Sequence, residues 1–237
     1  DHFRPNDVII PEIRSKMKHI LDFLKDLSSN NTREWFEMNK PVYNKVKADF
    51  ENFVNEIIAE IQRFDPSLGS LQAKDCTFRI YRDVRFSHDK SPYKTNIGAF
   101  MAKGGRKSAG SGYYLHIEPG KSFVGGGIYM PGPEVLKKIR QEIYFNPAAF
   151  RSIIEEKDFN RFFGKLSEED RLKRPPRDFP ADYPDMDLLM YKSYVCGHSL
   201  SDQDVVSPGM AGKVTNAFRA MRNLNLFLNK AVESDAG

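Results

Sequence analysis

Apolar residues recur every three or four positions over the first sixty residues, which is the spacing of one face of a helix. One series predicts a helix over about 15–28 and consists of Ile20, Phe23, Leu24 and Leu27. A second series over 35–61 predicts a longer helix that Pro41 breaks or restarts, because proline cannot donate the backbone hydrogen bond of a helix interior. Asn31, with Glu34 three residues later, matches a capping box at its start.

The period of the pattern changes to two after residue 74, and turn-forming residues become frequent. Strands are predicted near 76–83, 96–103, 112–118 and 122–130. Pro119-Gly120-Lys121 is a predicted tight turn, which makes 112–130 a β-hairpin. Three consecutive glycines, Gly125–Gly127, lie in its second strand and indicate a bulge or the close approach of another group.

Helical spacing returns over 134–145, and Asn146-Pro147 then has the composition of a helix start. Residues 166–185 are rich in charge and proline, so they are predicted to form a long loop. A last strand is predicted over 188–195 and a final helix over 210–232.

The predicted elements come in the order helices, strands, helices, with one late strand and no strand–helix–strand alternation. Segregated elements with short strand connections are typical of the α+β class. We therefore predict an α+β fold with a mainly antiparallel sheet packed against helices. Residues 17–237 are predicted to form a single domain, and residues 1–16 a weakly structured N-terminal extension.

Composition narrows the class of protein. Apolar residues make up 40% of the chain and charged residues 29%, which is typical of a globular protein. No apolar run reaches the roughly 18 residues of a membrane-spanning helix, so we expect no membrane partner. The two cysteines, Cys76 and Cys196, form no motif, which favours a reduced cytoplasmic protein. The formal charge of +4 is only mildly basic, whereas dedicated nucleic-acid binders usually carry a denser basic stripe.

The segment Arg79–Lys94 concentrates charge on a predicted strand and the loop after it. It holds five Arg and Lys side chains but only two carboxylates, Asp83 and Asp89, so it cannot neutralise itself. Charged side chains are rarely buried in strands unless they are paired, because removing them from water costs free energy. Either an ion-pair network with other segments or an anionic ligand would satisfy this surplus.

Strand alternation divides this segment into two predicted faces. The polar face consists of Arg79, Tyr81, Asp83 and Arg85. The core face, with one arginine as an exception, consists of Phe78, Ile80, Arg82, Val84 and Phe86. Guanidinium groups are planar, forked and permanently charged, which suits them to carboxylate and phosphate ligands.

We therefore expect a site for a phosphorylated or carboxylated small molecule. The predicted ligand-binding residues are Arg79, Tyr81, Arg82, Asp83, Arg85, Lys90, Tyr93 and Lys94. In this hypothesis the cations hold the anion, Asp83 orients a guanidinium, and the tyrosines donate hydrogen bonds or stack. If the site is catalytic, Asp83 or Asp89 is the candidate acid or base. The sequence leaves open whether the protein is an enzyme and identifies no cofactor.

Two other interpretations stay open. One is a nucleic-acid-associated module in which the same cations act together with Lys173, Arg174 and Arg177. The other is a purely structural network, in which the aspartates only tie the strand to the loop. A metal site is a lesser hypothesis, because close ligand spacing is absent from its three candidate ligands His88, His116 and His198.

The charged segment also resembles a known family. The residues that carry the resemblance are Arg79-x-x-Arg82-Asp83-x-Arg85-Phe86-x-x-Asp89-Lys90-x-x-Tyr93, together with Phe23-Leu24-x-x-Leu27, Asn30-Asn31, Trp35-Phe36 and Phe227-Leu228. This pattern is similar to that of domain of unknown function 2461, a family of conserved hypothetical proteins. The similarity runs from about Met17 to the C-terminus. It implies one family-wide domain in a mostly bacterial family, and it implies no activity.

Overall fold

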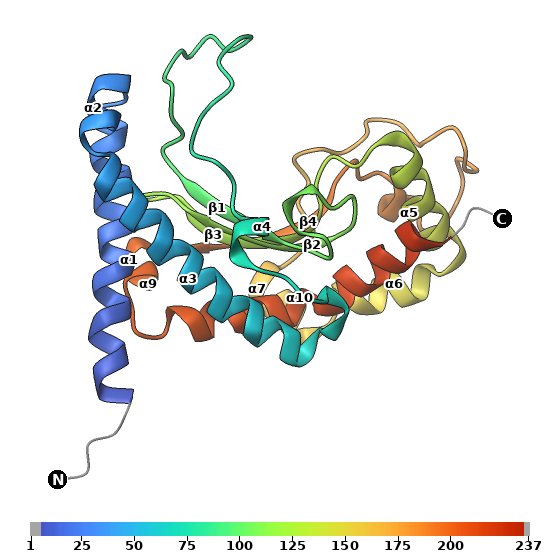
Figure 1. Cartoon of the computed structure of the whole chain (residues 1–237). Coiled ribbons are helices and arrows are strands. Elements are labelled where there is room, and N and C mark those ends of the chain that lie inside the picture. Colours follow the sequence, from blue (N-terminus) through green and yellow to red (C-terminus); the bar gives the residue numbers. More distant parts are fainter. Residues whose placement is uncertain (1–5, 235–237) are drawn as a thin grey trace. The chain divides into compact units, whose positions relative to one another are not determined.

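The computed structural model describes the backbone of residues 6–234 and the side chains of residues 16–234 (Figure 1). The helices are α1 (Asn6–Ser29), α2 (Arg33–Met38), α3 (Lys40–Phe64), α4 (Ala73–Cys76), α5 (Pro133–Phe145), α6 (Pro147–Ile154), α7 (Lys157–Phe163), α8 (Met186–Leu189), α9 (Asp202–Val205) and α10 (Met210–Glu233). Short 3-10 helices are η1 (Pro66–Leu68) and η2 (Gly105–Lys107). The strands are β1 (Ile97–Met101), β2 (Gly112–Ile117), β3 (Ser122–Ile128) and β4 (Tyr194–Leu200).

The predicted α+β class with an antiparallel sheet is confirmed. The four strands lie in the order β1-β2-β3-β4, so each strand pairs with its neighbour along the chain. The turn between β2 and β3 closes with a hydrogen bond of 2.9 Å from Lys121 N to Glu118 O. Gly120 in this turn has a φ of 73°, a conformation that glycine adopts without steric cost.

The chain divides into two compact units. The first comprises the chain up to Arg106, with Tyr114–Val124 and Ser199–Asn216. The second comprises Lys107–Tyr113, Gly125–His198 and the chain from Ala217 onward. The sequence-based boundaries, an extension over 1–16 and one domain over 17–237, stay a prediction.

In the first unit, α1 packs against α3. Their shared core includes Leu24, Phe50 and Ile57, all fully buried. The helix predicted over 15–28 is longer than expected, because α1 begins at Asn6. The break predicted near Pro41 is confirmed, since α2 ends at Met38 and this proline occupies the first turn of α3.

In the second unit, the glycines of β3 allow the close approach that the sequence predicts. A Cβ atom at Gly126 would lie 2.2 Å from Met221 Sδ of α10. A Cβ atom at Gly127, where φ is 102°, would lie 2.0 Å from the carbonyl oxygen of Tyr194 on β4. At Gly126 a Cβ atom would also lie 2.7 Å from the carbonyl oxygen of Gly112, so a larger residue at either position would press on neighbouring backbone.

Three local predictions are wrong. The segment 76–83 forms no strand, because among the described residues it makes only isolated bridges, Thr77 with Ala99 of β1 and Tyr81 with Tyr93. The strand predicted over 188–195 lies later, since Met186–Leu189 forms α8 and β4 begins at Tyr194. The cap of α2 is Thr32, whose Oγ1 accepts a hydrogen bond of 3.2 Å from Trp35 N.

Candidate functional site

The charged segment belongs to an arm, residues 77–96, that projects from the sheet just before β1 (Figure 1). Its two sides run antiparallel, and backbone contacts pair Thr77 with Ala99, Tyr81 with Tyr93, and Arg82 with Pro92. This pairing is too sparse to form a strand, yet it holds the two sides of the arm together. The cations are therefore displayed on a defined backbone.

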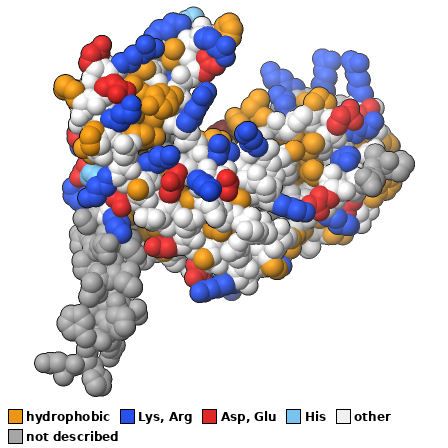
Figure 2. Space-filling view, viewed as in Figure 1, with side chains coloured by type: hydrophobic (Ala, Val, Ile, Leu, Met, Phe, Trp, Pro, Cys, Tyr) orange, Lys and Arg blue, Asp and Glu red, His pale blue; other side chains and the backbone are white. Residues whose placement is uncertain are grey.

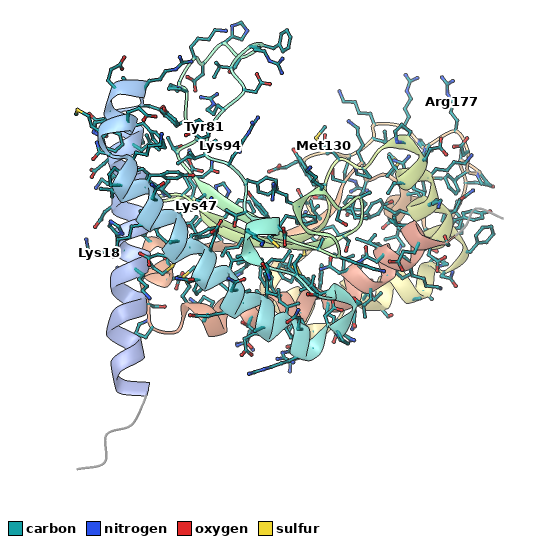
Figure 3. All side chains as sticks on the ribbon, in the orientation of Figure 1. Lys18, Lys47, Tyr81, Lys94, Met130 and Arg177 are labelled. Carbon is teal, nitrogen blue, oxygen red and sulfur yellow. The ribbon has the colours of Figure 1, made fainter. Side chains whose placement is uncertain are left out.

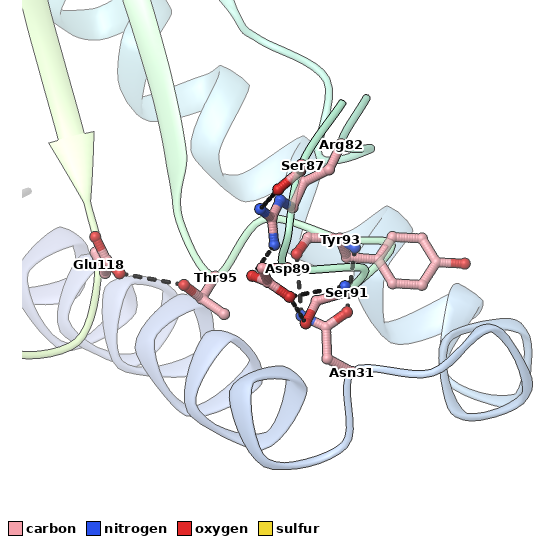
Figure 4. A network of polar contacts seen from close by, with 8 residues as sticks. All are labelled: Asn31, Arg82, Ser87, Asp89, Ser91, Tyr93, Thr95 and Glu118. Carbon is pink, nitrogen blue, oxygen red and sulfur yellow. Dashed lines mark hydrogen bonds and ion pairs between the residues drawn. The ribbon is translucent and has the colours of Figure 1, made fainter. Parts of the chain in front are cut away.

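The base of the arm is attached to the helices through Tyr93. The Tyr93 ring stacks on Phe36 of α2, with ring centroids 3.9 Å apart. Its backbone pairs with the Asn31 side chain, which donates to Tyr93 O at 3.0 Å and accepts from Tyr93 N at 3.1 Å (Figure 4). Asn31 thus holds the arm instead of capping α2. Asn31 and Tyr93, which belong to separate parts of the pattern that resembles the known family, are in contact here.

A second set of contacts orders the tip of the arm (Figure 4). Arg82 forms an ion pair with Asp89 Oδ2. The other oxygen of this carboxylate accepts hydrogen bonds from Ser91 N at 2.9 Å and Ser91 Oγ at 2.6 Å. The hydroxyl and amide of Ser91, followed by Arg82, lower the pKa of Asp89 below its usual range.

Asp83 and Arg85 form a separate bidentate pair. Arg85 Nε donates to Asp83 Oδ1 at 2.9 Å, and Nη2 donates to Oδ2 at 2.6 Å. The Arg85 guanidinium lowers the pKa of Asp83. Both carboxylates therefore accept hydrogen bonds from arginines of the same segment, and their predicted acid or base role stays a prediction.

Three cations of the arm remain without a carboxylate partner among the residues that the structure describes: Arg79, Lys90 and Lys94. Lys90 Nζ donates to the carbonyl of Val84 at 3.0 Å, and Lys94 Nζ donates to the carbonyl of Arg79 at 3.0 Å. Burial and the nearby Arg79 charge lower the pKa of Lys94, which lies near the base of the arm (Figure 3). Figure 2 shows Lys and Arg side chains over the arm and over the rest of the visible face.

The predicted polar face is exposed, but only Ile80 of the predicted core face is buried. Ile80 is buried, whereas Arg79, Tyr81, Asp83 and Arg85 are exposed. The prediction that Phe86 faces the core is wrong, because its side chain is 95% exposed at the tip of the arm. Phe78 is also at the surface, with an exposed fraction of 36%.

A hydrogen-bonded chain of side chains lies on β2 and was not predicted as a site. Tyr114 Oη lies 3.0 Å from His116 Nδ1, and His116 Nε2 lies 3.0 Å from Glu118 Oε2. Thr95, at the end of the arm, donates to Glu118 Oε1 at 3.1 Å (Figure 4). The alternation Tyr-x-His-x-Glu in a predicted strand places all three residues on one face, so the signal was present in the sequence.

The backbone of β1 leaves room for this chain. A Cβ atom at Gly98 would lie 2.8 Å from Tyr114 Oη, so a larger residue there would displace the hydroxyl. The Phe123 ring of β3 stacks on His116 with centroids 4.8 Å apart. The Phe78 ring lies 6.3 Å from the Tyr114 ring and 5.8 Å from Lys94 Nζ. The hydrogen-bonded side chains Tyr114, His116 and Glu118 and the base of the arm are therefore neighbours.

The three histidines considered for a metal site have other surroundings. His116 is held by Glu118 and Tyr114, His198 Nδ1 lies 2.9 Å from the carbonyl of Phe162, and His88 is exposed on the arm. Within the described part of the chain, no group of three or more His, Cys, Asp or Glu residues is arranged to hold a metal ion. No helix in that part is long and apolar enough to cross a membrane.

Comparison with known proteins adds one match. No curated protein and no solved structure is similar to this chain. The family model described as conserved hypothetical protein (DUF2461) matches residues 19–227, a stretch that includes the whole arm and the chain of side chains on β2. The protein therefore belongs to the DUF2461 family of conserved hypothetical proteins.

Proposed function

We propose that the base of the arm binds a small anion, a phosphorylated or carboxylated molecule. One observation carries this proposal: both carboxylates of the segment are used by arginines of the same segment, and Arg79, Lys90 and Lys94 are left over. A bidentate Arg–carboxylate pair is close to saturated, so Arg85 has little capacity for a further anion. The ligand would instead neutralise Arg79 and Lys94 at the base of the arm.

Arg79 and Lys94 are the central residues of this proposal. They are adjacent, since Lys94 donates a hydrogen bond to the carbonyl of Arg79. Burial, followed by the like charge of Arg79, lowers the pKa of Lys94. An anion placed against both would relieve this repulsion, and the partial burial of Lys94 would strengthen the attraction by lowering the local dielectric constant.

The remaining predicted residues have supporting roles. Asp83 and Asp89 fix Arg85 and Arg82, so they shape the arm without touching the ligand. Tyr93 is buried against Phe36 and holds the arm in place. Tyr81 is more exposed and offers its hydroxyl or its ring to a ligand.

Calorimetric titration with sodium pyrophosphate at low ionic strength tests this proposal. We expect Arg79→Ala and Lys94→Ala each to weaken binding about tenfold or more, because each removes a charge-assisted hydrogen bond of about 1.5–3 kcal/mol. Arg63→Ala is the matched control, since Arg63 is an exposed arginine of α3 paired with Glu60. Equal affinity in all four proteins, or no binding to the wild type, would contradict the proposal.

Phe86 favours a second candidate function, association with single-stranded nucleic acid. This ring is 95% exposed, and the Arg85 guanidinium lies 5.9 Å from its centroid. An exposed aromatic ring beside cations can stack a base while the cations contact phosphates. The formal surplus of the whole chain is only +4, which keeps this candidate second.

Fluorescence titration with a labelled oligothymidylate separates the two candidates. Nucleic-acid binding predicts a loss of affinity in Phe86→Ala but not in Phe145→Ala, an equally apolar control with an exposed fraction of 73%. It also predicts a log–log salt slope of about −2, from three uncompensated cations at about 0.7 each on a single strand. Absence of oligonucleotide binding at low salt would eliminate this candidate.

We also propose that the protein works in the bacterial cytoplasm. Cys76 and Cys196 are both free and buried, and burial raises the pKa of the Cys76 thiol to about 12. Buried, protonated thiols are inert and persist where disulfide formation is disfavoured. The family resemblance supports a bacterial origin.

A further inference from the structure

The chain Thr95–Glu118–His116–Tyr114 has a defined direction of hydrogen bonding. Glu118 can only accept when it is ionised, so it accepts from Thr95 Oγ1 and from His116 Nε2. A proton on Nε2 leaves Nδ1 of the neutral ring as an acceptor, and Tyr114 must then donate its hydroxyl proton there. Each of these three hydrogen bonds then has one donor and one acceptor.

The surroundings of His116 hold it in this arrangement. It contacts Tyr114 of β2 and Glu118, the residue after β2, and the uncharged Phe123 ring of β3 stacks on it. The side chains of His116 and Glu118 are only 12% and 20% exposed. The imidazole is therefore oriented by a carboxylate on one nitrogen and a hydroxyl on the other, as in catalytic triads where the carboxylate fixes the tautomer.

The Phe78 ring lies between the free end of these hydrogen-bonded side chains and the Lys94 ammonium. Tyr114 is flanked by Phe78, whose other neighbour is Lys94. Tyr114 is only partly buried, and burial followed by the Glu118 charge raises its pKa to about 12. Its phenol thus stays protonated at neutral pH and can donate a hydrogen bond to an anion.

We propose that Tyr114, His116 and Glu118 form a proton-transfer site that acts on the anion held by Arg79 and Lys94. This inference rests on the proposed anion binding. When the anion arrives, the Tyr114 hydroxyl turns from His116 Nδ1 to an oxygen of the ligand. The freed Nδ1 takes up one proton from solvent, and the resulting imidazolium is stabilised by Glu118 and by the ligand charge.

With the anion bound and His116 protonated, the site is a general acid for phosphorylated or carboxylated ligands. In the transfer step the Tyr114 O–H bond breaks and a ligand O–H bond forms. At the same time the His116 Nδ1–H bond breaks and the tyrosine O–H bond forms again. One proton passes from the imidazolium to the ligand, and no other reactant is consumed. Tyr114 is the residue in contact with the ligand, whereas His116 stores the proton and Glu118 is a positioning residue.

Proton uptake on binding of a non-titrating anion tests this mechanism without knowledge of the natural substrate. Sodium sulfate is titrated into the full chain about one pH unit above the ordinary histidine pKa of ~6.5. The titration is carried out in Tris and in HEPES, which have different ionisation enthalpies. We expect the two binding heats to differ by the equivalent of about one proton taken up per sulfate bound.

Variants assign the proton. His116→Gln keeps a hydrogen-bonding side chain but cannot titrate, so we expect sulfate to bind with equal heats in both buffers. Tyr114→Phe should also abolish proton uptake and weaken sulfate binding about tenfold, because it removes one charge-assisted hydrogen bond. His198→Gln and Tyr129→Phe are the matched controls and should behave as the wild type.

The outcomes separate the two proposals. Sulfate binding with equal heats in Tris and HEPES would overturn the proton-transfer site and leave the anion site standing. An unchanged proton uptake in His116→Gln would also overturn it. Absence of sulfate binding would overturn both.

Discussion

At the scale of single residues, Asn31 attaches the arm to the helices. Its amide satisfies both the N–H and the carbonyl of Tyr93, a residue that is only 4% exposed. Two backbone groups would lose their partners together if this amide were removed. A buried polar group without a partner costs about 1–3 kcal/mol.

We therefore expect Asn31→Ala to lower the free energy of unfolding by about 2–4 kcal/mol, measured by urea denaturation. The matched control is Asn30→Ala, since the exposed Asn30 amide donates only to the carbonyl of Asp26 one turn back in α1. Similar losses in the two variants would show that the Asn31–Tyr93 contact does not hold the arm.

Two glycines with positive φ offer a second comparison at this scale. Gly127 and Gly120 have φ values of 102° and 73°, but only Gly127 has another backbone, that of Tyr194, within contact distance of an added Cβ. Both alanine substitutions carry the left-handed penalty of about 1–2 kcal/mol. The steric clash should lower the free energy of unfolding of Gly127→Ala by about 1–3 kcal/mol more than that of Gly120→Ala. Equal melting temperatures for the two variants would contradict this packing.

At the scale of elements, periodicity predicted most of the helices and the β2–β3 hairpin. It located the long helices because their buried stripes, such as Phe50, Phe53 and Ile57 in α3, are continuous. Periodicity failed at 76–83. Alternation of polar and apolar residues indicates which side chains face the core, but it does not indicate whether a neighbouring strand is present. Ile80 is buried on the arm as an inward strand residue would be, although no strand forms.

The short helix α9 illustrates an element that depends on local electrostatics. Its capping box joins Ser201 and Asp204, and Asp204 also forms an ion pair with Lys213 of α10. Lys213, followed by Ser201, lowers the pKa of Asp204 to about 2. This pKa is below the unfolded value of ~3.9. The stabilising contribution of the Asp204 carboxylate is therefore fully present above pH ~3.9 and is lost as pH falls through about 2.

We expect Asp204→Asn to reduce the loss of stability between about pH 4 and pH 2, since the asparagine side chain does not titrate. The measurement is the free energy of unfolding as a function of pH. Asp158→Asn, at an exposed aspartate in the first turn of α7, is the control and should leave the wild-type profile unchanged. An acid dependence equal to that of the wild type in Asp204→Asn would refute the assignment.

At the scale of the whole molecule, excess positive charge is concentrated in the segment 79–94. The segment 79–94 has a surplus of three positive charges, from five cations and two carboxylates, whereas the entire chain has a formal charge of +4. The sequence alone therefore predicted where the uncompensated charge lies. It could not predict which cations are left over, because that depends on how Asp83 and Asp89 choose their partners on the folded arm.

The chain of side chains on β2 shows the other limit of the sequence. Tyr114, His116 and Glu118 share a face by strand alternation, but their link to the arm through Thr95 depends on the pairing of β1 with β2. Such pairing is a long-range property of the fold. The proposed site therefore combines a charge surplus visible in the sequence with a proton relay visible only in the structure.

Anomalous diffraction from crystals grown with sodium tungstate would test the anion site most directly, because tungstate is a tetrahedral dianion that can be located without ambiguity. We predict a tungstate ion within hydrogen-bonding distance of the Arg79 guanidinium and Lys94 Nζ in the wild type, and its loss in Arg79→Ala crystals. A carboxylate occupying Arg79 in place of the anion, or tungstate bound only elsewhere, would contradict the proposed function.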